Sequence, residues 1–347
     1  METLTEKLGD VLKELGRAFL VAGYLPAAVF VLAHQLFLFP RWLDGRVSLF
    51  TVPGDETWAW VYLVDQALTL LVLPLTVGIL LMGLNTFIVR LYEGSFRWQR
   101  GFLLWPWQRR NERRVEALYG ELMALKRADQ QVLIDLNKVS TGQDRTALEQ
   151  KRASLALELQ REHEAIEARV AHQRLPHRKE KVKPTALGNA FALIEEYPYE
   201  RYGMDGTLYW PRLRPLVAEQ HAAALVNGKL TLDLLLNLSL LAGVFGIEAI
   251  VVGLVGSVDW GVIAAGGGAL VLAWVCYRGG VSTVRSLGDT IALCFDFFRG
   301  ALADPYGLDR PADLEAEQAM WLRLGQFLRR GESFYFPDRS VSPGDEA

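Results

Sequence analysis

The sequence has few of the residues from which most recognisable sites are built. It contains only two cysteines, Cys276 and Cys294, and five histidines among 347 residues. The two cysteines match no common zinc or redox spacing and are too few for a disulfide framework. No glycine-rich phosphate loop and no nucleophile beside a recognisable base occurs in the sequence. We therefore expect no metal, no cofactor, no catalytic residue and a function that is not enzymatic.

An excess of one charge sign is also missing. Lysine and arginine number 37 against 40 acidic residues, which leaves a net charge of -3. This balance excludes the strongly basic surface of a nucleic-acid-binding domain, so we expect no nucleic-acid partner. A cleavable signal peptide is not expected either, because the first apolar run is long and no small-residue cleavage site follows it.

Long apolar runs, in contrast, are abundant. About 20 apolar residues are needed to cross a hydrocarbon core of ~30 Å. Four runs meet this requirement, and they cover residues 18–39, 60–89, 230–255 and 260–277. Pro26 and Pro74 lie inside the first two runs and should kink their helices, with neighbouring groups satisfying the carbonyls that proline leaves free.

The distribution of basic residues predicts the orientation of these spans. The segment after the second span carries seven arginines: Arg90, Arg97, Arg100, Arg109, Arg110, Arg113 and Arg114. The loop between the last two spans has no basic residue and contains only Asp259. Basic residues gather on the cytoplasmic side of a membrane. We therefore expect a multi-pass protein of the cell inner membrane, with both termini and the large middle region in the cytoplasm.

The expected fold class is an all-α membrane protein with four transmembrane helices and a cytoplasmic helical domain. The amphipathic stretch 1–16 either lies on the membrane surface or packs as an ordinary soluble helix. Transmembrane helices 1 and 2 are expected within 17–93, followed by a helical hairpin and basic linker over 94–186 and a junction over 187–229. Transmembrane helices 3 and 4 are expected within 230–280. Cytoplasmic helices should follow within 281–332, the last of them over about 313–330, and a flexible tail over 333–347.

The middle region reads as two helices folded into an antiparallel hairpin. Leucine and valine recur every three or four residues on either side of STGQD, residues 140–144, where Asp144 is a possible N-cap. Each helix should be roughly 40 Å long. The narrow apolar stripe resembles that of a coiled coil and could pair within the hairpin or with another subunit. The basic linker 175–185 either touches anionic lipid or is an ordinary exposed linker.

A polar segment, residues 187–213, reads LGNAFALIEEYPYERYGMDGTLYWPRL. Its first part should form a short helix over 189–197 that Pro198 ends, and TLYW could be extended. Its acids lie near arginines and tyrosines, which indicates a structural ion-pair network more than a ligand-sensing, gating or hydrolytic site. We expect it to couple the cytoplasmic and membrane domains. The residues assigned to this coupling junction are Glu196, Arg201, Asp205, Arg212, Asp296 and Arg299.

Three strings in this chain resemble motifs of a family of uncharacterised bacterial membrane proteins with four spans. They are RLYEG at 90–94, the string LGN…EEYPYERYGMDG…WPRL within 187–213, and ALCFDFFR at 292–299. The third string has phenylalanine where the family pattern has histidine. The resemblance covers nearly the whole chain and implies the four-span layout, but it implies no known activity. The missing histidine argues against a role for imidazole at that position.

Ionisable residues inside apolar spans are candidates for function, because burying a charge in lipid is costly. Glu248 lies well inside the third span, Asp65 near the outer end of the second, and Asn237 adds polarity to the third. These three are the intramembrane polar candidates for a pore. Glu248 is either a pore-lining or proton-linked carboxylate or an acid hydrogen-bonded to another helix. Asp65 is expected at the interface, and His34 is expected to form a hydrogen bond between helices.

The fourth span contains small residues four positions apart, such as Ala264 and Gly268, a spacing that marks a helix–helix interface within or between subunits. Our main functional hypothesis is an oligomeric membrane protein that forms or gates an ion-conducting path coupled to its cytoplasmic helices. The alternative is a membrane-anchored scaffold or sensor that recruits a cytoplasmic protein partner through the hairpin. The expected partners are therefore the lipid bilayer, further copies of the chain and possible cytoplasmic proteins.

Overall fold

A computed structural model describes residues 16–39, 56–138, 143–173, 175–176, 178–255, 258–309 and 311–334. Every regular element in these ranges is a helix, which confirms the predicted all-α class. The chain divides into two compact units. One comprises Met1–Tyr92 and Arg214–Phe298, the other Glu93–Leu213 and Arg299–Ala347. The predicted N-terminal helix and tail lie almost wholly outside the described residues.

Three helices of the described chain are long and apolar enough to cross a membrane, namely Gly16–Phe37, Glu219–Leu254 and Trp260–Tyr306. A fourth candidate is a bent pair, Thr69–Gly83 and Asn85–Glu93, whose halves meet at 62°. The described chain therefore has three helices of spanning length, or four if the bent pair forms one span. The second predicted span corresponds to this bent pair of helices and is therefore not a single straight helix.

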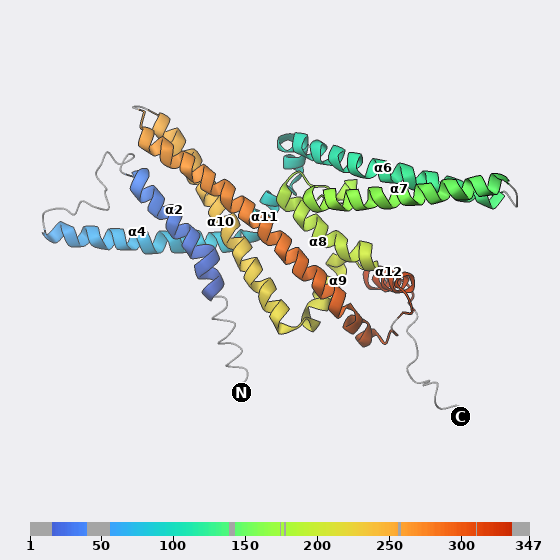
Figure 1. The fold of residues 1–347 in the computed structure, drawn as a ribbon. Coiled ribbons are helices and arrows are strands. Elements are labelled where there is room, and N and C mark those ends of the chain that lie inside the picture. Colours follow the sequence, from blue (N-terminus) through green and yellow to red (C-terminus); the bar gives the residue numbers. More distant parts are fainter. Residues whose placement is uncertain are drawn as a thin grey trace, which may run out of the picture. The chain divides into compact units, whose positions relative to one another are not determined.

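In the first unit, α10 (Glu219–Leu254) and α11 (Trp260–Ala303) form a long antiparallel hairpin (Figure 1). Gly246 meets Gly266 near the closed end, and further along Ser239 donates a hydrogen bond to the carbonyl of Ala273 (2.8 Å). At 1.5 Å per residue the two helices are about 54 and 66 Å long, well beyond a ~30 Å hydrocarbon core. The predicted third span is therefore only part of α10, and α11 continues past the predicted fourth span without a break.

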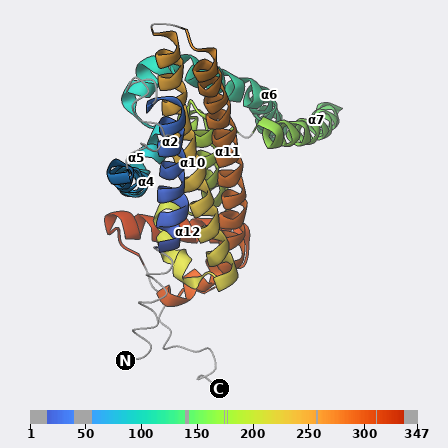
Figure 2. The ribbon, with the colours of Figure 1, turned by 90° about the vertical axis from the view of Figure 1, so that its left-hand side faces the viewer.

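The first helix is built from a π-helix, η1 (Phe19–Tyr24), followed by α2 (Leu25–Phe37). It lies beside α10 and runs parallel to it, since Ala22 contacts Asn237 and His34 contacts Glu248. Figure 2 shows α2, α10 and α11 side by side. A kink is predicted at Pro26; in the structure the π-helix η1 ends at Tyr24 and Pro26 is the second residue of α2.

The second predicted span comprises α4 (Glu56–Gly83) and α5 (Asn85–Glu93). α4 runs as one helix through Pro74, where a kink is predicted, and a separate bend of 62° lies at Leu84, between α4 and α5. Gly83, next to this bend, gives the backbone greater freedom. Gly23 and Gly78 meet where this helix crosses η1, since a Cβ added at Gly23 would lie 3.0 Å from the Gly78 carbonyl oxygen.

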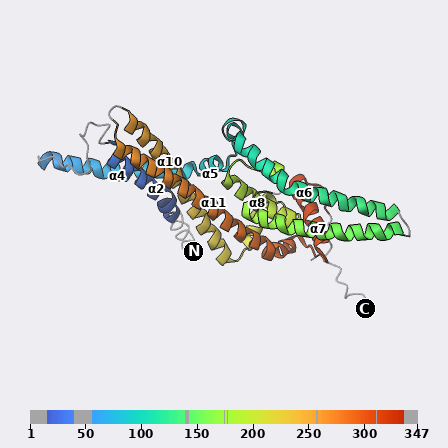
Figure 3. The ribbon, with the colours of Figure 1, turned by 45° about the horizontal axis from the view of Figure 1, so that its top comes forward.

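The second unit contains the predicted hairpin, formed by α6 (Trp105–Lys138) and α7 (Gln143–Gln173), which lie side by side in Figures 1 and 3. Helices of 34 and 31 residues are about 51 and 46 Å long, somewhat more than predicted. Asp144 is the second residue of α7, so its predicted place as the N-cap was wrong. The base of the hairpin is closed by Val115, Leu175 and Val182.

The polar segment folds into α8 (Ala186–Tyr202) and α9 (Gly206–Leu213), which pack near α12 (Leu314–Arg330). Two predictions were wrong here. Pro198 does not end α8, which runs on to Tyr202. Gly203, with a left-handed φ of 71°, caps the helix there. TLYW is helical instead of extended. Short helical turns complete the chain at Gln99–Leu103 (η2), Lys179–Lys181 (η3), Arg214–Leu216 (η4) and Asp304–Tyr306 (η5).

Candidate functional site

The most chemically distinctive contact in the first unit joins His34 of α2 to Glu248 of α10. The imidazole Nε2 lies 2.7 Å from Glu248 Oε2, and Nδ1 lies 2.9 Å from the carbonyl oxygen of Phe30. Both side chains belong to helices that are long and apolar enough to cross a membrane. The sequence marks Glu248 as a functional candidate and His34 as a hydrogen bonder between helices, and the structure joins the two.

The two hydrogen-bond partners of His34 indicate which ring nitrogen can donate to each of them. A backbone carbonyl can only accept, so Nδ1 of His34 holds a hydrogen and donates it to Phe30. The close approach of Nε2 and Glu248 Oε2 then needs one shared proton. Either a protonated Glu248 donates to a neutral imidazole, or an imidazolium donates to a carboxylate. Both arrangements have no net charge, which makes the pair tolerable among apolar side chains.

The two partners differ in exposure. Rings of Phe30, Phe39 and Phe245 surround the imidazole at centroid distances of 4.1, 6.1 and 5.3 Å. The His34 side chain is 10% exposed, whereas the Glu248 side chain is 41% exposed. The imidazole is therefore enclosed within the unit, and the carboxyl group opens onto the outer surface of α10.

Asn237, the second polar candidate of α10, forms a hydrogen bond with the first helix. It is 2% exposed, and its Nδ2 donates to the carbonyl oxygen of Ala22 at 2.7 Å. Pro26 has no N–H group, so the Ala22 carbonyl four residues earlier lacks its usual helical donor. Asn237 supplies that donor from α10. Its own Oδ1 is buried and has no hydrogen-bond partner among the described residues.

A second polar relay joins three helices and involves Tyr92 of the RLYEG string. The Tyr92 hydroxyl donates to Ser239 Oγ at 2.9 Å, and Ser239 Oγ donates to the carbonyl of Ala273 at 2.8 Å. Tyr92 also stacks on Tyr277 with a centroid distance of 5.8 Å. Sequence reasoning missed Ser239, because a single serine in an apolar run gives no signal. The side chain of Asp65, in α4, lies outside the described part of the structure.

In the second unit, the RLYEG and LGN strings meet although about 90 residues separate them. Gly188 leaves room for the carbonyl of Glu93, which an added Cβ would overlap, and Gly94, with a φ of 71°, packs against Pro184. The Asn189 side-chain oxygen accepts from the Lys183 backbone N–H at 2.7 Å. The glycines and the asparagine of these strings are therefore explained by close packing and backbone hydrogen bonding.

Glu196 and Asp205, both predicted for the coupling junction, are bound by cations from outside the polar segment. The side chain of Glu196 is 3% exposed and accepts from the Arg178 backbone N–H at 3.2 Å, with the Arg178 guanidinium 4.0 Å away. Asp205 caps α9 by accepting from the backbone N–H of Leu208 and of Thr207, and it pairs with Arg329 of α12. The prediction that the segment's own arginines neutralise these acids was wrong.

The electrostatics of Asp205 follow from these contacts. Partial burial opposes ionisation, but the hydrogen bonds from Thr207 and Leu208 and the charge of Arg329 outweigh it and lower the pKa of Asp205. Nearby, burial raises the pKa of Tyr209, whose hydroxyl donates to the carbonyl of Trp321 at 2.6 Å. The contact of α9 with α12 therefore holds an ionised carboxylate and a neutral phenol.

Arg299 is the other predicted junction residue with a defined partner. Its Nε donates to Glu317 Oε1 at 2.8 Å, and its guanidinium lies 4.0 Å from the centre of the Tyr202 ring. Arg212 donates to the Leu208 carbonyl at 2.6 Å, within α9. Arg201 is exposed, and its backbone carbonyl accepts from Gln318 at 3.0 Å. Asp296 is half-buried in α11 and belongs to the first unit.

The positions at which the chain passes between the two units coincide with the three motif strings. These positions are Tyr92/Glu93 in RLYEG, Leu213/Arg214 at the end of WPRL, and Phe298/Arg299 in ALCFDFFR. Each string therefore contributes residues to both units or ends where one unit stops. Sequence reasoning identified the strings but had no means of finding this coincidence.

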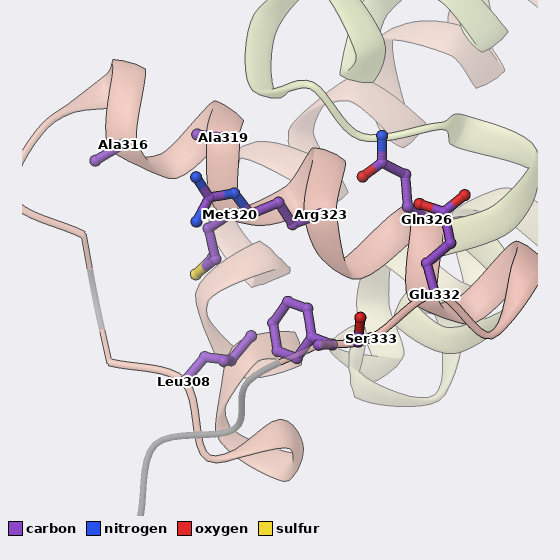
Figure 4. A pocket seen from close by; sticks show the side chains of 9 residues that line it. Leu308, Ala316, Ala319, Met320, Arg323, Gln326, Glu332 and Ser333 are labelled. Carbon is purple, nitrogen blue, oxygen red and sulfur yellow. The ribbon is translucent and has the colours of Figure 1, made fainter.

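Two hollows lie beside α12 in the described part of the second unit. One is an open groove of about 830 Å³, in which Leu308 lies across from Met320 and Arg323 (Figure 4). Phe334 also lines this groove. The other, of about 190 Å³, lies next to Asp205, Tyr209 and Arg329. No group of three or more histidine, cysteine, aspartate or glutamate side chains in the described residues is placed to hold a metal ion.

Comparisons of the chain with models of protein families, with curated proteins and with solved structures gave no match. The chemistry of the site is therefore the basis for a functional assignment.

Proposed function

We propose that this chain is an inner-membrane protein that assembles from several copies and forms or gates an ion-conducting path, with both termini in the cytoplasm. In this proposal the His34–Glu248 pair is the group in the path that takes up and releases a proton. The coupling junction, with Glu196, Asp205 and Arg299, links the path to the cytoplasmic helices. The proposed function is not enzymatic. The proposal includes membership of the family of four-span bacterial membrane proteins that the three motif strings resemble.

The observation that carries the proposal is the position of Glu248 on its helix. It lies on the same face of α10 as the exposed side chains of Val244, Ile247 and Val251, which are three or four residues apart. In a single copy this face would meet lipid, where a half-exposed carboxyl group is costly. A second copy of the chain or a water-filled path would remove that cost.

Small residues on α11 support an assembly of copies. A Cβ at Gly266 would lie 2.8 Å from the Gly246 carbonyl oxygen, so this glycine is used inside the α10–α11 hairpin. A Cβ added at Gly267 or Gly268 would meet nothing within 4 Å among the described residues, and Ala264 is exposed. Ala264 and Gly268 have the spacing that allows another helix to approach closely.

The second candidate function is a membrane-anchored scaffold or sensor that recruits a cytoplasmic protein. It is favoured by two exposed apolar side chains of the hairpin that lie far from the tryptophans at the start of α6. Ile134 of α6 is 49% exposed and Leu157 of α7 is 52% exposed. A partner helix that packs on the hairpin would cover them. This candidate predicts a specific cytoplasmic partner and needs no ion flux.

Flux through liposomes distinguishes the two candidates. We expect purified full-length protein to carry ions when a pH gradient or voltage is applied, read in parallel by a pH dye and a potassium dye. Glu248→Gln keeps the size of the side chain and a hydrogen bond to His34, but it cannot release a proton. We therefore expect its flux to fall to the level of protein-free liposomes.

The matched control is Glu219→Gln, which removes an exposed carboxylate from the first turn of the same helix. Its flux should equal that of the unmodified protein. Absence of flux at every pH and voltage, or equal flux from Glu248→Gln and the unmodified protein, would contradict the conducting role and leave the scaffold as the better account.

A further inference from the structure

The segment between α5 and α6 exposes an unusual number of aromatic side chains. It reads FRWQRGFLLWPWQRRNER over residues 96–113 and is called here the arginine–tryptophan segment. Phe102 is 88% exposed, and four further large apolar side chains are also exposed: Trp98, Leu103, Trp105 and Trp107. Such a cluster is uncommon on a surface that meets only water.

The local fold holds these side chains outward. The chain forms the π-helix η2, closed by a hydrogen bond from the Leu104 N–H to the Gln99 carbonyl at 2.7 Å. Gln99 is 4% exposed, and its side-chain oxygen accepts from the Phe96 N–H at 3.3 Å. With Gln99 turned inward, the turn presents Trp98 and Phe102 to the outside.

The first turns of α6 have one inner face and one outer face. The inner face is fixed to the linker, because Gln108 donates to the Val182 carbonyl at 2.9 Å and Asn111 donates to the Lys183 carbonyl at 3.1 Å. At 100° per residue, Arg109, Arg110 and Arg113 lie on the opposite face. These arginines are exposed, beside the exposed tryptophans.

The arginines of the outer face are not neutralised by ion pairs in the described residues. The two acids in these turns are engaged toward the linker, since Glu112 accepts from Gln108 at 2.9 Å and Glu116 pairs with Lys179. Among the described residues, no carboxylate forms an ion pair with the outward arginines. These arginines are Arg97, Arg109, Arg110 and Arg113.

The basic linker provides the contrast. Its cations all have carboxylate partners: Arg178 with Glu196, Lys179 with Glu116, Lys181 with Glu195, and Lys183 with Glu93. Of the two basic stretches that the sequence offers, the linker is therefore occupied by the protein's own acids. The arginine–tryptophan segment is the one whose charge is available to another molecule.

We propose that the arginine–tryptophan segment is an interfacial anchor that seats on an anionic phospholipid surface. Tryptophan rings favour the boundary between headgroups and acyl chains, and arginine binds phosphate. Arg109 already lies 4.3 Å from the centre of the Trp105 ring, which leaves its donors beside an apolar surface. Six residue steps separate the end of α5 at Glu93 from Gln99, so the chain can place η2 no more than ~20 Å from that helix end.

This inference rests on the membrane location in the proposed function, but not on ion conduction. It concerns a surface outside the candidate spans, and it assigns the anchoring of the second unit to this segment instead of to the linker. The proposal requires anionic lipid, because arginines that are not paired with carboxylates would gain little binding free energy from a neutral lipid surface.

The test uses full-length protein in nanodiscs, with Cys276 and Cys294 replaced by alanine and one new cysteine labelled with an environment-sensitive dye. Three label positions are compared: Phe102→Cys in the segment, Val271→Cys on the exposed face of α11, and Ala153→Cys on α7. Quenching is measured with lipids that carry a nitroxide near the headgroup or deep in the acyl chain, in phosphatidylcholine with and without phosphatidylglycerol.

We expect the label at 102 to be quenched from the headgroup level only when phosphatidylglycerol is present. Replacing Arg97, Arg109, Arg110 and Arg113 by glutamine should abolish this quenching, whereas replacing the exposed hairpin cations Arg127, Lys151 and Arg161 should leave it unchanged. The label at 153 should remain unquenched, and the label at 271 should be quenched deep in the bilayer in either lipid.

Two results would overturn the anchor. One is a label at 102 that stays unquenched in anionic discs while the label at 271 is quenched, which leaves the membrane location intact. The other is equal quenching at 102 with and without phosphatidylglycerol, which removes the role of the arginines. If the label at 271 also escapes quenching, the membrane location fails together with the anchor.

Discussion

At the scale of single residues, the polar side chains of the apolar helices act mainly by completing the hydrogen bonding of other groups. Asn237 donates to a carbonyl that Pro26 leaves without a donor, and Ser239 passes a hydrogen bond from Tyr92 to Ala273. Buried polar groups are expected to find such partners. Glu248 differs from them, because its carboxyl group remains half-exposed while it binds His34.

The link between Asn237 and Pro26 can be tested by a double-mutant cycle. Asn237→Leu removes the donor to the Ala22 carbonyl and should destabilise the protein by about 1 kcal/mol. Pro26→Ala restores a backbone N–H at position 26, so Asn237→Leu should cost little in that background. Unfolding in detergent micelles measures the four proteins. Equal costs in both backgrounds would show that the two residues are not coupled.

Asp205 should make the stability of the second unit depend on pH. Its pKa is lowered in the folded protein, so its contribution is present above the unfolded value of about 3.9 and is lost as the pH falls through the folded value. Asp205→Ala also removes the cap of α9 and should cost about 1 kcal/mol at neutral pH. In thermal unfolding, the difference in unfolding temperature between Asp205→Ala and the unmodified protein should become smaller at acid pH.

The control for Asp205 is Asp309→Ala, which removes an exposed acid from the same unit. It should produce little change at any pH. If the difference in unfolding temperature between Asp205→Ala and the unmodified protein stayed constant from neutral to acid conditions, the ionisation of Asp205 would not contribute to stability.

At the scale of helices, close approach of backbones is the recurring device. Gly23 meets Gly78, Gly246 meets Gly266, and Gly188 meets the carbonyl of Glu93. Between apolar helices in lipid, packing of this kind takes the place of the hydrophobic effect. The α10–α11 hairpin therefore depends on which of three consecutive glycines faces its partner.

Adjacent glycines in α11 allow a matched experiment. Gly266→Ala would place a Cβ 2.8 Å from the Gly246 carbonyl oxygen, so the helices must separate, at a cost of about 1–3 kcal/mol. Gly267→Ala meets nothing within 4 Å in the described residues and should be neutral or stabilising, because alanine favours a helix by up to about 1 kcal/mol. Thermal stability in detergent should rank the two variants in this order, and the reverse order would contradict the packing.

At the scale of the whole molecule, the chain forms two units and passes between them at the three motif strings. Within the second unit, Asp205 and Glu196 of the predicted junction bind cations of α12 and the linker instead of the arginines in their own segment.

The whole-molecule prediction concerns the number of copies. The half-exposed carboxyl group of Glu248 and the open face around Gly268 should be covered by further copies of the chain. We expect native mass spectrometry of protein released from gentle detergent to give a particle with more than one chain, and Glu248→Leu to leave that assembly intact because it keeps the face apolar. A strictly monomeric particle would contradict the assembly and weaken the proposed path.

The sequence by itself determined the helical class, the long apolar helices and the hairpin, because hydrophobic run length and helical periodicity are local properties. It also determined the last helix, since α12 occupies the predicted range, with Asp313 as its N-cap. The predictions at Pro198 and TLYW were wrong, because local propensity there does not decide where a helix ends. Proline costs one hydrogen bond, which packing can outweigh.

Only the tertiary structure decided which polar residues meet. Glu248 and His34 are 214 residues apart, Asn237 and Ala22 are 215 apart, and Asp205 and Arg329 are 124 apart. No periodicity or spacing encodes such pairs, since each depends on which face of one helix packs against another. The sequence therefore identified the candidate site residues, and only the packing of the helices showed that the carboxyl group of Glu248 in α10 meets the imidazole of His34 in α2.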